Sequence, residues 1–162
     1  MARPDLDRPI VASVLDRLLD SNPDLAVDPP KGRGQYLREM RDSVRRDIEN
    51  LLNTRQRCRG WPDGLHELDQ SLVNYGIPDF TGTDLSADQH REEFRATVET
   101  VLRSYEPRFA SVSVTMLPGD RLDRTLRFRI EALLHADPVP EPIVFDSYVD
   151  PASRSFAIVG AG

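Results

Sequence analysis

The side chains with the clearest potential for chemistry are three histidines and one cysteine. His66, His90 and His135 lie in separate segments, and none has a second ligand at the spacing of a metal site. Cys58 lies among arginines, which favour the reactive thiolate, but the sequence places no base beside it. We therefore interpret Cys58 as an inert free cysteine and predict no catalytic residue, no metal and no cofactor.

Carboxylate pairs are a second source of possible chemistry, because glycoside hydrolysis uses one as the acid and another as the nucleophile or base. With 27 aspartates and glutamates in the chain, such a pair can always be nominated, so abundance alone defines no site. Glu106 is the most informative acid, since Glu106-Pro107-Arg108 ends a predicted helix. The two charges either face a common partner surface or hold the turn by internal hydrogen bonds. The residues alone favour the internal bonds.

A positive segment stands out in a chain whose formal net charge is −6. Between residues 38 and 59 seven arginines, Arg45 and Arg46 among them, outweigh four acids. One interpretation is an acceptor for an acidic partner. The alternative, which the general behaviour of surface charges favours, is a hydrated helix face whose arginines also interact with carbonyls at the helix C-terminus.

Two amphipathic helices are predicted to position these side chains. Apolar residues recur at three- and four-residue spacing over 35–54 and again over 86–105, where Pro107 prevents continuation. Between them, the apolar residues of 65–73 predict a short helix that Gly76 stops.

The first 34 residues are predicted to form an arm attached to a domain of residues 35–162. Leu15, Leu18 and Leu19 lie on one face of a short amphipathic helix, and three prolines and two glycines follow between residues 21 and 34. This helix either docks into a groove of a partner or folds back on the core of its own domain. The residues leave both alternatives open.

The C-terminal third changes to the two-residue period of β-strands. Alternating patterns over 111–116 and 126–132 predict one hairpin, and 143–149 with 155–159 predict another. The helices must cover the apolar face of this sheet, because neither layer buries its apolar stripe alone. The predicted fold is α+β, a single domain with N-terminal helices packed on a C-terminal antiparallel β-meander.

Composition excludes several classes of partner. A pI near 5.1 argues against nucleic acid and anionic lipid, since both need a positive surface. No apolar run approaches the roughly 20 residues of a membrane span, and the polar N-terminus lacks the apolar core of a signal peptide. With one cysteine that forms no intramolecular disulfide, we expect a cytoplasmic protein.

Four segments occur in order along the chain and together resemble one known family. They are Ser13-Val-Leu-Asp-Arg-Leu18, Ser43-Val-Arg-Arg-Asp-Ile-Glu-Asn-Leu-Leu-Asn-Thr-Arg55, Ser71-Leu-Val-Asn-Tyr-Gly-Ile-Pro-Asp-Phe80 and Tyr105-Glu-Pro-Arg108. Over most of its length the chain resembles the TssE family of type VI secretion baseplate subunits, which is related to the tail-lysozyme-like phage baseplate wedge proteins. Four ordered segments are more specific than any one of them.

The resemblance implies a structural, non-catalytic baseplate subunit in the cytoplasm, docked at the inner membrane through the baseplate. It implies TssF, TssG and TssK as wedge partners, with the TssB–TssC sheath above them. It also implies that Glu106, Pro107 and Arg108 form an assembly contact rather than a purely internal turn. The competing class, suggested by the lysozyme label of the family, is a peptidoglycan-cleaving hydrolase.

The predicted meander and the resemblance together lead to a hypothesis of strand addition. A sheet edge within residues 111–159 would offer N–H and C=O groups to an incoming sheath strand and so start sheath polymerisation. The outward charges Arg127, Arg129 and Glu131 would set the register of that strand.

Overall fold

The structure is a computed structural model that describes most of the chain from residue 32 onward and a short segment before it. The described residues are 14–19, 24, 32–57, 60, 62, 64–80, 87–118, 125–136, 139–150, 153 and 155–160. Cys58 and most of the predicted tether over 21–34 lie outside them.

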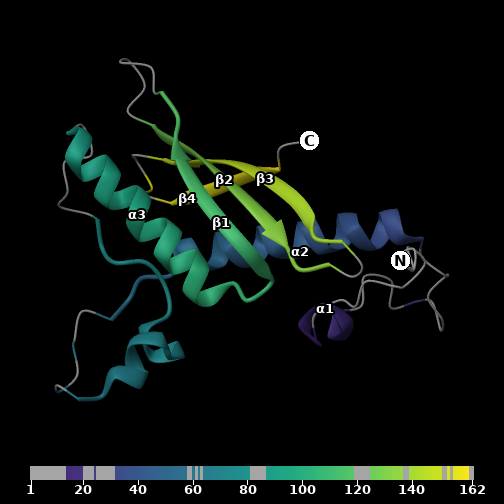
Figure 1. Ribbon diagram of the computed structural model, residues 1–162, viewed down its shortest axis with the longest axis horizontal. Helices are drawn as coiled ribbons and strands as arrows, with labels where there is room; N and C mark the ends of the chain where they lie inside the picture. Colours follow the sequence, from purple (N-terminus) through teal and green to yellow (C-terminus); the bar gives the residue numbers. More distant parts are fainter. Residues whose placement is uncertain are drawn as a thin grey trace, which may run out of the picture.

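Two long helices precede the sheet, as the periodicity predicts. Helix α2 spans Arg33–Asn53 and helix α3 spans Asp88–Tyr105, each within two residues of its predicted bounds. Helix α1 is a short segment, Val14–Leu18, that Figure 1 shows below α2. None of the helices in the described ranges combines the length and the apolar character needed to cross a membrane.

The single short helix predicted over residues 65–73 is wrong, because this segment forms two separate 3₁₀ turns. They are η1, His66–Gln70, and η2, Leu72–Asn74. Ser71 interrupts them in an extended conformation, and its hydroxyl accepts a hydrogen bond from the Val73 N–H at 3.3 Å. The apolar residues here form no buried helix face, since Leu72 is 83% exposed.

Four antiparallel strands form a meander in chain order, which confirms the predicted α+β fold. They are β1, Phe109–Met116; β2, Leu126–Leu134; β3, Glu141–Val149; and β4, Phe156–Gly160. Because each strand pairs with the next one along the chain, β1 and β4 are the two edge strands.

Both long helices cover the same face of this sheet, α3 beside β1 and α2 beside β4 (Figure 1). Three phenylalanines meet in the core: Phe94 of α3, Phe128 of β2 and Phe156 of β4, with ring centroids 5.9 to 6.1 Å apart. Around them pack buried aliphatic residues of α2, including Ile48 and Leu52. The opposite face of the sheet carries charged side chains that are exposed or half-buried, among them Arg127, Arg129, Glu131 and Asp146.

Candidate functional site

The Glu106-Pro107-Arg108 turn is built around the Glu106 carboxylate. This side chain is only 5% exposed, and its two oxygens accept hydrogen bonds from the Arg108 guanidinium, Oε1 from Nε at 2.7 Å and Oε2 from Nη2 at 2.5 Å. Oε1 also accepts from the Arg108 backbone N–H at 3.1 Å. Pro107, between the two charges, is exposed. The turn therefore has a rigid polar interior and an outward-facing proline.

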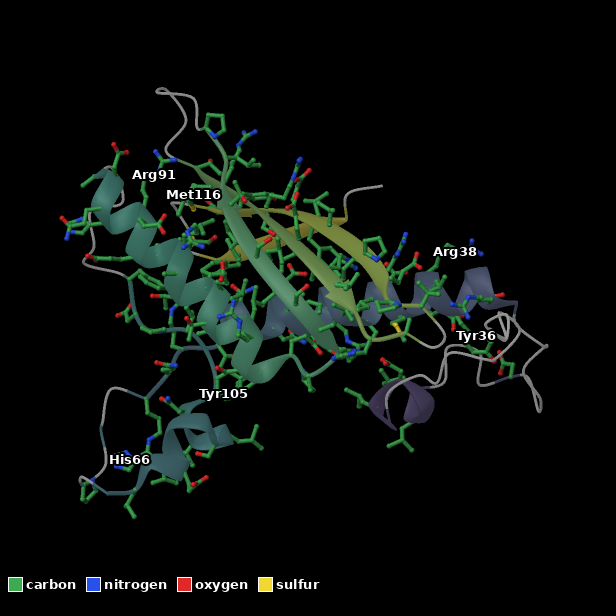
Figure 2. The ribbon with its side chains drawn as sticks, viewed as in Figure 1. Tyr36, Arg38, His66, Arg91, Tyr105 and Met116 are labelled. Carbon is green, nitrogen blue, oxygen red and sulfur yellow. The ribbon has the colours of Figure 1, made fainter. Side chains whose placement is uncertain are left out.

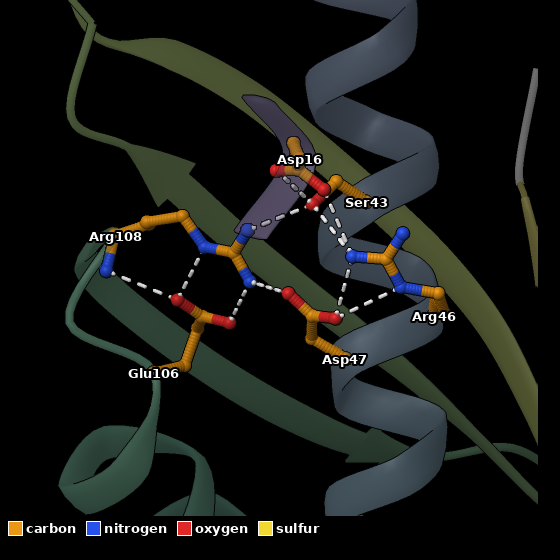
Figure 3. A network of polar contacts seen from close by, with 6 residues as sticks. All are labelled: Asp16, Ser43, Arg46, Asp47, Glu106 and Arg108. Atoms are coloured by element: carbon orange, nitrogen blue, oxygen red, sulfur yellow. Dashed lines mark hydrogen bonds and ion pairs between the residues drawn. The ribbon is translucent and has the colours of Figure 1, made fainter. Parts of the chain in front are cut away.

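Arg108 connects this turn to α2. Its Nη2 donates to Asp47 Oδ2 at 2.7 Å, and its Nη1 donates to Ser43 Oγ at 3.1 Å. Ser43 and Asp47 are four residues apart, so both lie on the face of α2 that meets the turn. One guanidinium thus joins the end of α3, the start of β1 and the middle of α2 (Figure 3).

The same network extends to α1 through Arg46. The Arg46 guanidinium donates to Asp47 Oδ1 at 3.0 Å and to Asp16 Oδ1 of α1 at 2.9 Å. Asp16 Oδ2 in turn accepts from the Ser43 hydroxyl at 2.7 Å. We call these six residues the junction cluster: Asp16, Ser43, Arg46, Asp47, Glu106 and Arg108 (Figure 3).

The electrostatics of the junction cluster favour the charged forms of its cations. Burial lowers the pKa of Arg108, but the hydrogen bonds and charges of Glu106 and Asp47 outweigh it and raise that pKa well above its ordinary value. The hydrogen bond to Asp16 is the largest influence on Arg46, whose pKa is also raised. Burial, with smaller contributions from Asp47 and Glu106, raises the pKa of the nearby Tyr75 phenol.

The other predicted contact residues lie in three places: on α2 outside the junction cluster, on β2, and at the N-terminal helix. Arg45 points away from the junction cluster, pairs with Glu49 at 3.7 Å and lines a groove between α2 and β3. Arg127 and Arg129 lie on β2, a central strand, where Arg129 Nε donates to Asp146 Oδ1 of β3 at 2.7 Å. A central strand has no free backbone edge, so these two arginines do not lie beside one. Their side chains are on the face of the sheet opposite the helices.

The leucines of the N-terminal helix are directed to solvent. Leu15, Leu18 and Leu19 are 54%, 77% and 53% exposed. Polar contacts join α1 to α2: Asp16 accepts hydrogen bonds from Ser43 and Arg46. The acid of the helix thus holds it against α2, and its two leucines, Leu15 and Leu18, are exposed.

The two edges of the sheet differ in how their backbone groups are satisfied. On β1, the Val114 N–H donates to Glu99 Oε2 at 3.3 Å, and the Val114 C=O accepts from Arg95 Nη1 at 3.4 Å. Arg91 of α3 donates to the C=O of Leu117, the residue that follows β1, at 3.4 Å; Figure 2 labels Arg91 close to Met116 at the end of β1. Side chains of α3 therefore cap the middle of this edge and bond the residue that follows the strand.

On β4, the Asn53 side chain caps the first residue. Its Oδ1 accepts from the Phe156 N–H and its Nδ2 donates to the Phe156 C=O, both at 2.9 Å, as the backbone of a neighbouring strand would. Beyond Phe156, no hydrogen bond within the described residues reaches the outer edge of β4.

Sequence reasoning nominated Glu106, Arg108 and Arg46 for contact but missed the acids that join them, Asp47 and Asp16. Asp47 pairs with Arg108 across 61 sequence positions, a separation at which no local spacing signal operates. The only sequence feature that relates Asp47 to the cluster is its spacing of four from Ser43, which puts both residues on one face of the helix.

Two helices on one face of an antiparallel meander, joined at a paired charge cluster, define an α+β structural domain. Residues 38–139 match the family model described as baseplate wedge protein gp25. The chain belongs to this family of structural baseplate components.

One solved structure that is similar to the chain is described as "The baseplate complex from the type VI secretion system". The matched chain of that complex is 23% identical, with a TM-score of 0.46, and the match covers 70% of this chain and 96% of that one. No curated protein matches the sequence.

Proposed function

We propose that the chain is a structural subunit of a bacterial type VI secretion baseplate, in the position that TssE occupies. The observation that carries this proposal is the match of residues 38–139 to the baseplate wedge family, a range that contains both long helices and the Glu106-Pro107-Arg108 turn. The four ordered segments that resemble TssE support the more specific assignment to type VI secretion.

The partners of this proposal are the wedge proteins TssF, TssG and TssK, together with the TssB–TssC sheath, and the site of assembly is the cytoplasmic side of the inner membrane. Pro107 is the part of the turn that is placed to meet a wedge partner, because Glu106 and Arg108 are engaged with each other and with α2. Their role in the contact is to hold the proline in one position.

Strand addition to the sheet is the proposed link to the sheath. An edge with unpaired N–H and C=O groups is a template for another strand. The capping of Val114 by Glu99 and Arg95 makes β1 a poor acceptor, so the side of the sheet formed by β3 and β4 is the favoured entry.

The hydrolase alternative receives no support from the best acid in the sequence. Both oxygens of the Glu106 carboxylate accept hydrogen bonds from Arg108, and the side chain is almost fully buried. A general acid for glycoside hydrolysis must instead reach the glycosidic oxygen of a bound sugar.

Co-purification with the wedge proteins tests the proposal. Tagged full-length chain, expressed with TssF, TssG and TssK from the same genome, is expected to elute with them. Pro107→Arg is expected to abolish that co-elution without changing the melting temperature, because Pro107 is exposed. Ser104→Arg, at an exposed position three residues earlier on α3, is the matched control and should co-elute normally. A wild-type chain that elutes alone would contradict the proposal.

A further inference from the structure

Strand β3 is longer than the strand that covers its outer side. β3 spans Glu141–Val149, whereas β4 pairs with it only from Val149 back to Phe145, which lies opposite Gly160. The first four residues of β3, Glu141–Val144, therefore pair with β2 on one side and have no strand partner on the other among the described residues.

A groove of about 430 Å³ lies beside this unpaired part of β3. Its walls come from two elements and the end of a third: β3 residues 142–145, Gly160 of β4, and a row of α2 side chains, Arg38, Arg41, Asp42 and Arg45. Figure 2 labels Arg38 on the N-terminal half of α2. Gly160 leaves the space open, since a Cβ added there would meet no atom within 4 Å.

The backbone of β3 presents hydrogen-bonding groups to this groove. The Asp150 N–H donates to the Ser155 C=O, which marks Asp150 as a residue whose backbone points toward β4. Because this orientation alternates, Tyr148, Asp146 and Val144 point the same way. Val144 is therefore the next residue of β3 whose N–H and C=O point toward the β4 side. It lies beyond Phe145 and Gly160, the last described pair of the two strands, so both groups point into the groove.

The charge of the groove is positive in a chain that is acidic as a whole. Three arginines and one aspartate of α2 line it, while the whole chain carries a net charge of −6. Arg41 donates to Glu141 Oε1 at 3.1 Å, so an acid at the start of β3 already occupies part of this arginine row. Arg38 has no ion pair among the described residues, and Arg45 has only the long contact with Glu49.

We infer that this groove receives an extended acidic strand of a partner, which pairs with Val144 and places carboxylates against Arg38, Arg41 and Arg45. The inference rests on the proposed strand addition. It specifies where the strand binds and which charge its side chains carry. Side chains of the entering strand alternate. Those opposite Glu141 and Ile143 face α2 and meet the arginines, and the one opposite Val144 lies on the outer face of the sheet beside Val144 and Val159.

A model peptide tests the groove directly. The probe is an acetylated, amidated peptide of four Val-Glu repeats, added to isotope-labelled full-length chain, with a Val-Lys peptide of equal length as control. The Val-Glu peptide is expected to shift the Val144 amide resonance, to slow its hydrogen exchange, and to bind at least about tenfold more tightly than the Val-Lys peptide at low salt.

Five variants, one of them a control on α3, separate the backbone contribution from the charge contribution. Val144→Pro removes the edge N–H and is expected to abolish peptide binding, whereas Val144→Ala keeps it and should bind normally. The double change Arg38→Gln and Arg45→Gln should weaken binding about tenfold, and Glu141→Gln, which releases Arg41, should strengthen it. Arg103→Gln, on the exposed side of α3, is expected to have no effect.

Several outcomes would overturn the inference. One is a Val144 amide that is already protected from exchange in the free chain, which would assign the edge to the chain's own residues. Others are equal affinity for the two peptides, or resonance shifts confined to β1. If Val144→Pro fails to fold, as judged by its melting curve, the arginine and Glu141 variants decide the question.

Sheath assembly in cells distinguishes this inference from the proposed function. Normal sheaths with Val144→Pro would overturn the groove as the entry site and leave baseplate membership intact. Peptide binding by a chain that does not co-purify with TssF and TssG would support the groove and contradict the proposed function.

Discussion

Glu106 and Arg108 show how a charged pair is accommodated at the centre of this molecule. Glu106 is almost fully buried, and an isolated carboxylate in that position would cost several kcal/mol of desolvation. Two hydrogen bonds from Arg108 and one from its backbone offset that cost, and Asp47 shares the guanidinium. Removal of one partner leaves the other charge buried. The stability of the turn therefore depends on both residues.

The first prediction concerns this coupling. Glu106→Ala and Arg108→Ala should each reduce the free energy of unfolding by about 3 kcal/mol, because each leaves an unpaired charge. The double variant should lose clearly less than the two single losses added together, with a coupling energy of about 1–3 kcal/mol. Urea denaturation of the four proteins measures this cycle, and strictly additive losses would show that the two charges act independently.

The second prediction concerns Glu99, which caps the β1 edge. Burial raises its pKa, but the hydrogen bonds from the Val114 N–H, Arg103 and Arg95 outweigh this and lower the pKa below its ordinary value of 4.5. A lowered carboxylate pKa in the folded state contributes stability that is present above pH 4.5 and is lost as pH falls through the folded-state pKa.

Glu99→Gln should therefore destabilise the fold by about 1 kcal/mol at pH 7, and the difference from wild type should shrink as the pH is lowered toward 3. Urea unfolding at several pH values measures it. Glu93→Gln, at an exposed position of the same helix, is the control and should change little at any pH. A loss of stability that is the same at pH 7 and pH 3 would rule out the charge as its cause.

At the residue scale, the sequence identified the ends of the junction cluster but not its connections. Glu106 and Arg108 were recognisable because a proline between opposite charges marks the end of a helix. Internal bonds of the kind that the residues alone favour are present, and the role of the turn in partner binding stays a prediction. Asp16 and Asp47 were not distinguishable from the other acids of the chain, because their partners are set by tertiary packing.

At the scale of elements, periodic segments were predictable and aperiodic ones were not. Both long helices and all four strands follow from their 3.6- and two-residue periods, since one buried face dictates each pattern. In the segment between α2 and α3, the apolar residues of 65–73 predict one short helix, but two 3₁₀ turns form instead. The position of this segment depends on a parallel bridge between Arg55 and Ile77, in which the Ile77 N–H donates to the Thr54 C=O at 2.8 Å.

Gly76 is the residue that allows this bridge, and it supplies the third prediction. Its φ of 112° is rare for residues with a side chain, and a Cβ at Gly76 would lie 2.4 Å from the Thr54 carbonyl oxygen. Gly76→Ala should therefore lower the free energy of unfolding by about 2 kcal/mol or more.

Gly64 provides the matched control for this substitution. Its φ of 96° is also positive, but a Cβ there would meet no atom within 4 Å. Gly64→Ala should cost about 1 kcal/mol of backbone strain alone. Thermal or urea denaturation compares the two variants, and equal losses would show that the Thr54 contact is unimportant.

At the scale of the whole molecule, the junction cluster and the β3 groove lie on different sides of α2. The cluster, with Arg46, connects α2 to α1 and to the turn after α3, whereas Arg38, Arg41 and Arg45 face β3. One helix thus separates the proposed wedge contact at Pro107 from the proposed strand entry at Val144. In the proposed assembly, the subunit would hold a wedge partner and a sheath strand at the same time.

The family match and the proposed strand entry cover different parts of the chain. The match ends at residue 139, and β3 begins at Glu141. Membership in the baseplate wedge family therefore rests on the helices and the first hairpin. The part of β3 that has no described strand partner on its outer side, Glu141–Val144, became recognisable only from the register of β4, because a difference in length between two strands leaves no signal in the periodicity of either.

A density map of the chain assembled with TssF, TssG, TssK and the first TssB–TssC ring tests both proposed contacts, at Pro107 and at β3, in one measurement. We expect a wedge protein in contact with Pro107 and a partner strand paired with β3 at Val144, with carboxylates against the arginines of α2. An assembled baseplate that lacks the chain, or one in which partners leave both Pro107 and this sheet edge bare, would contradict it.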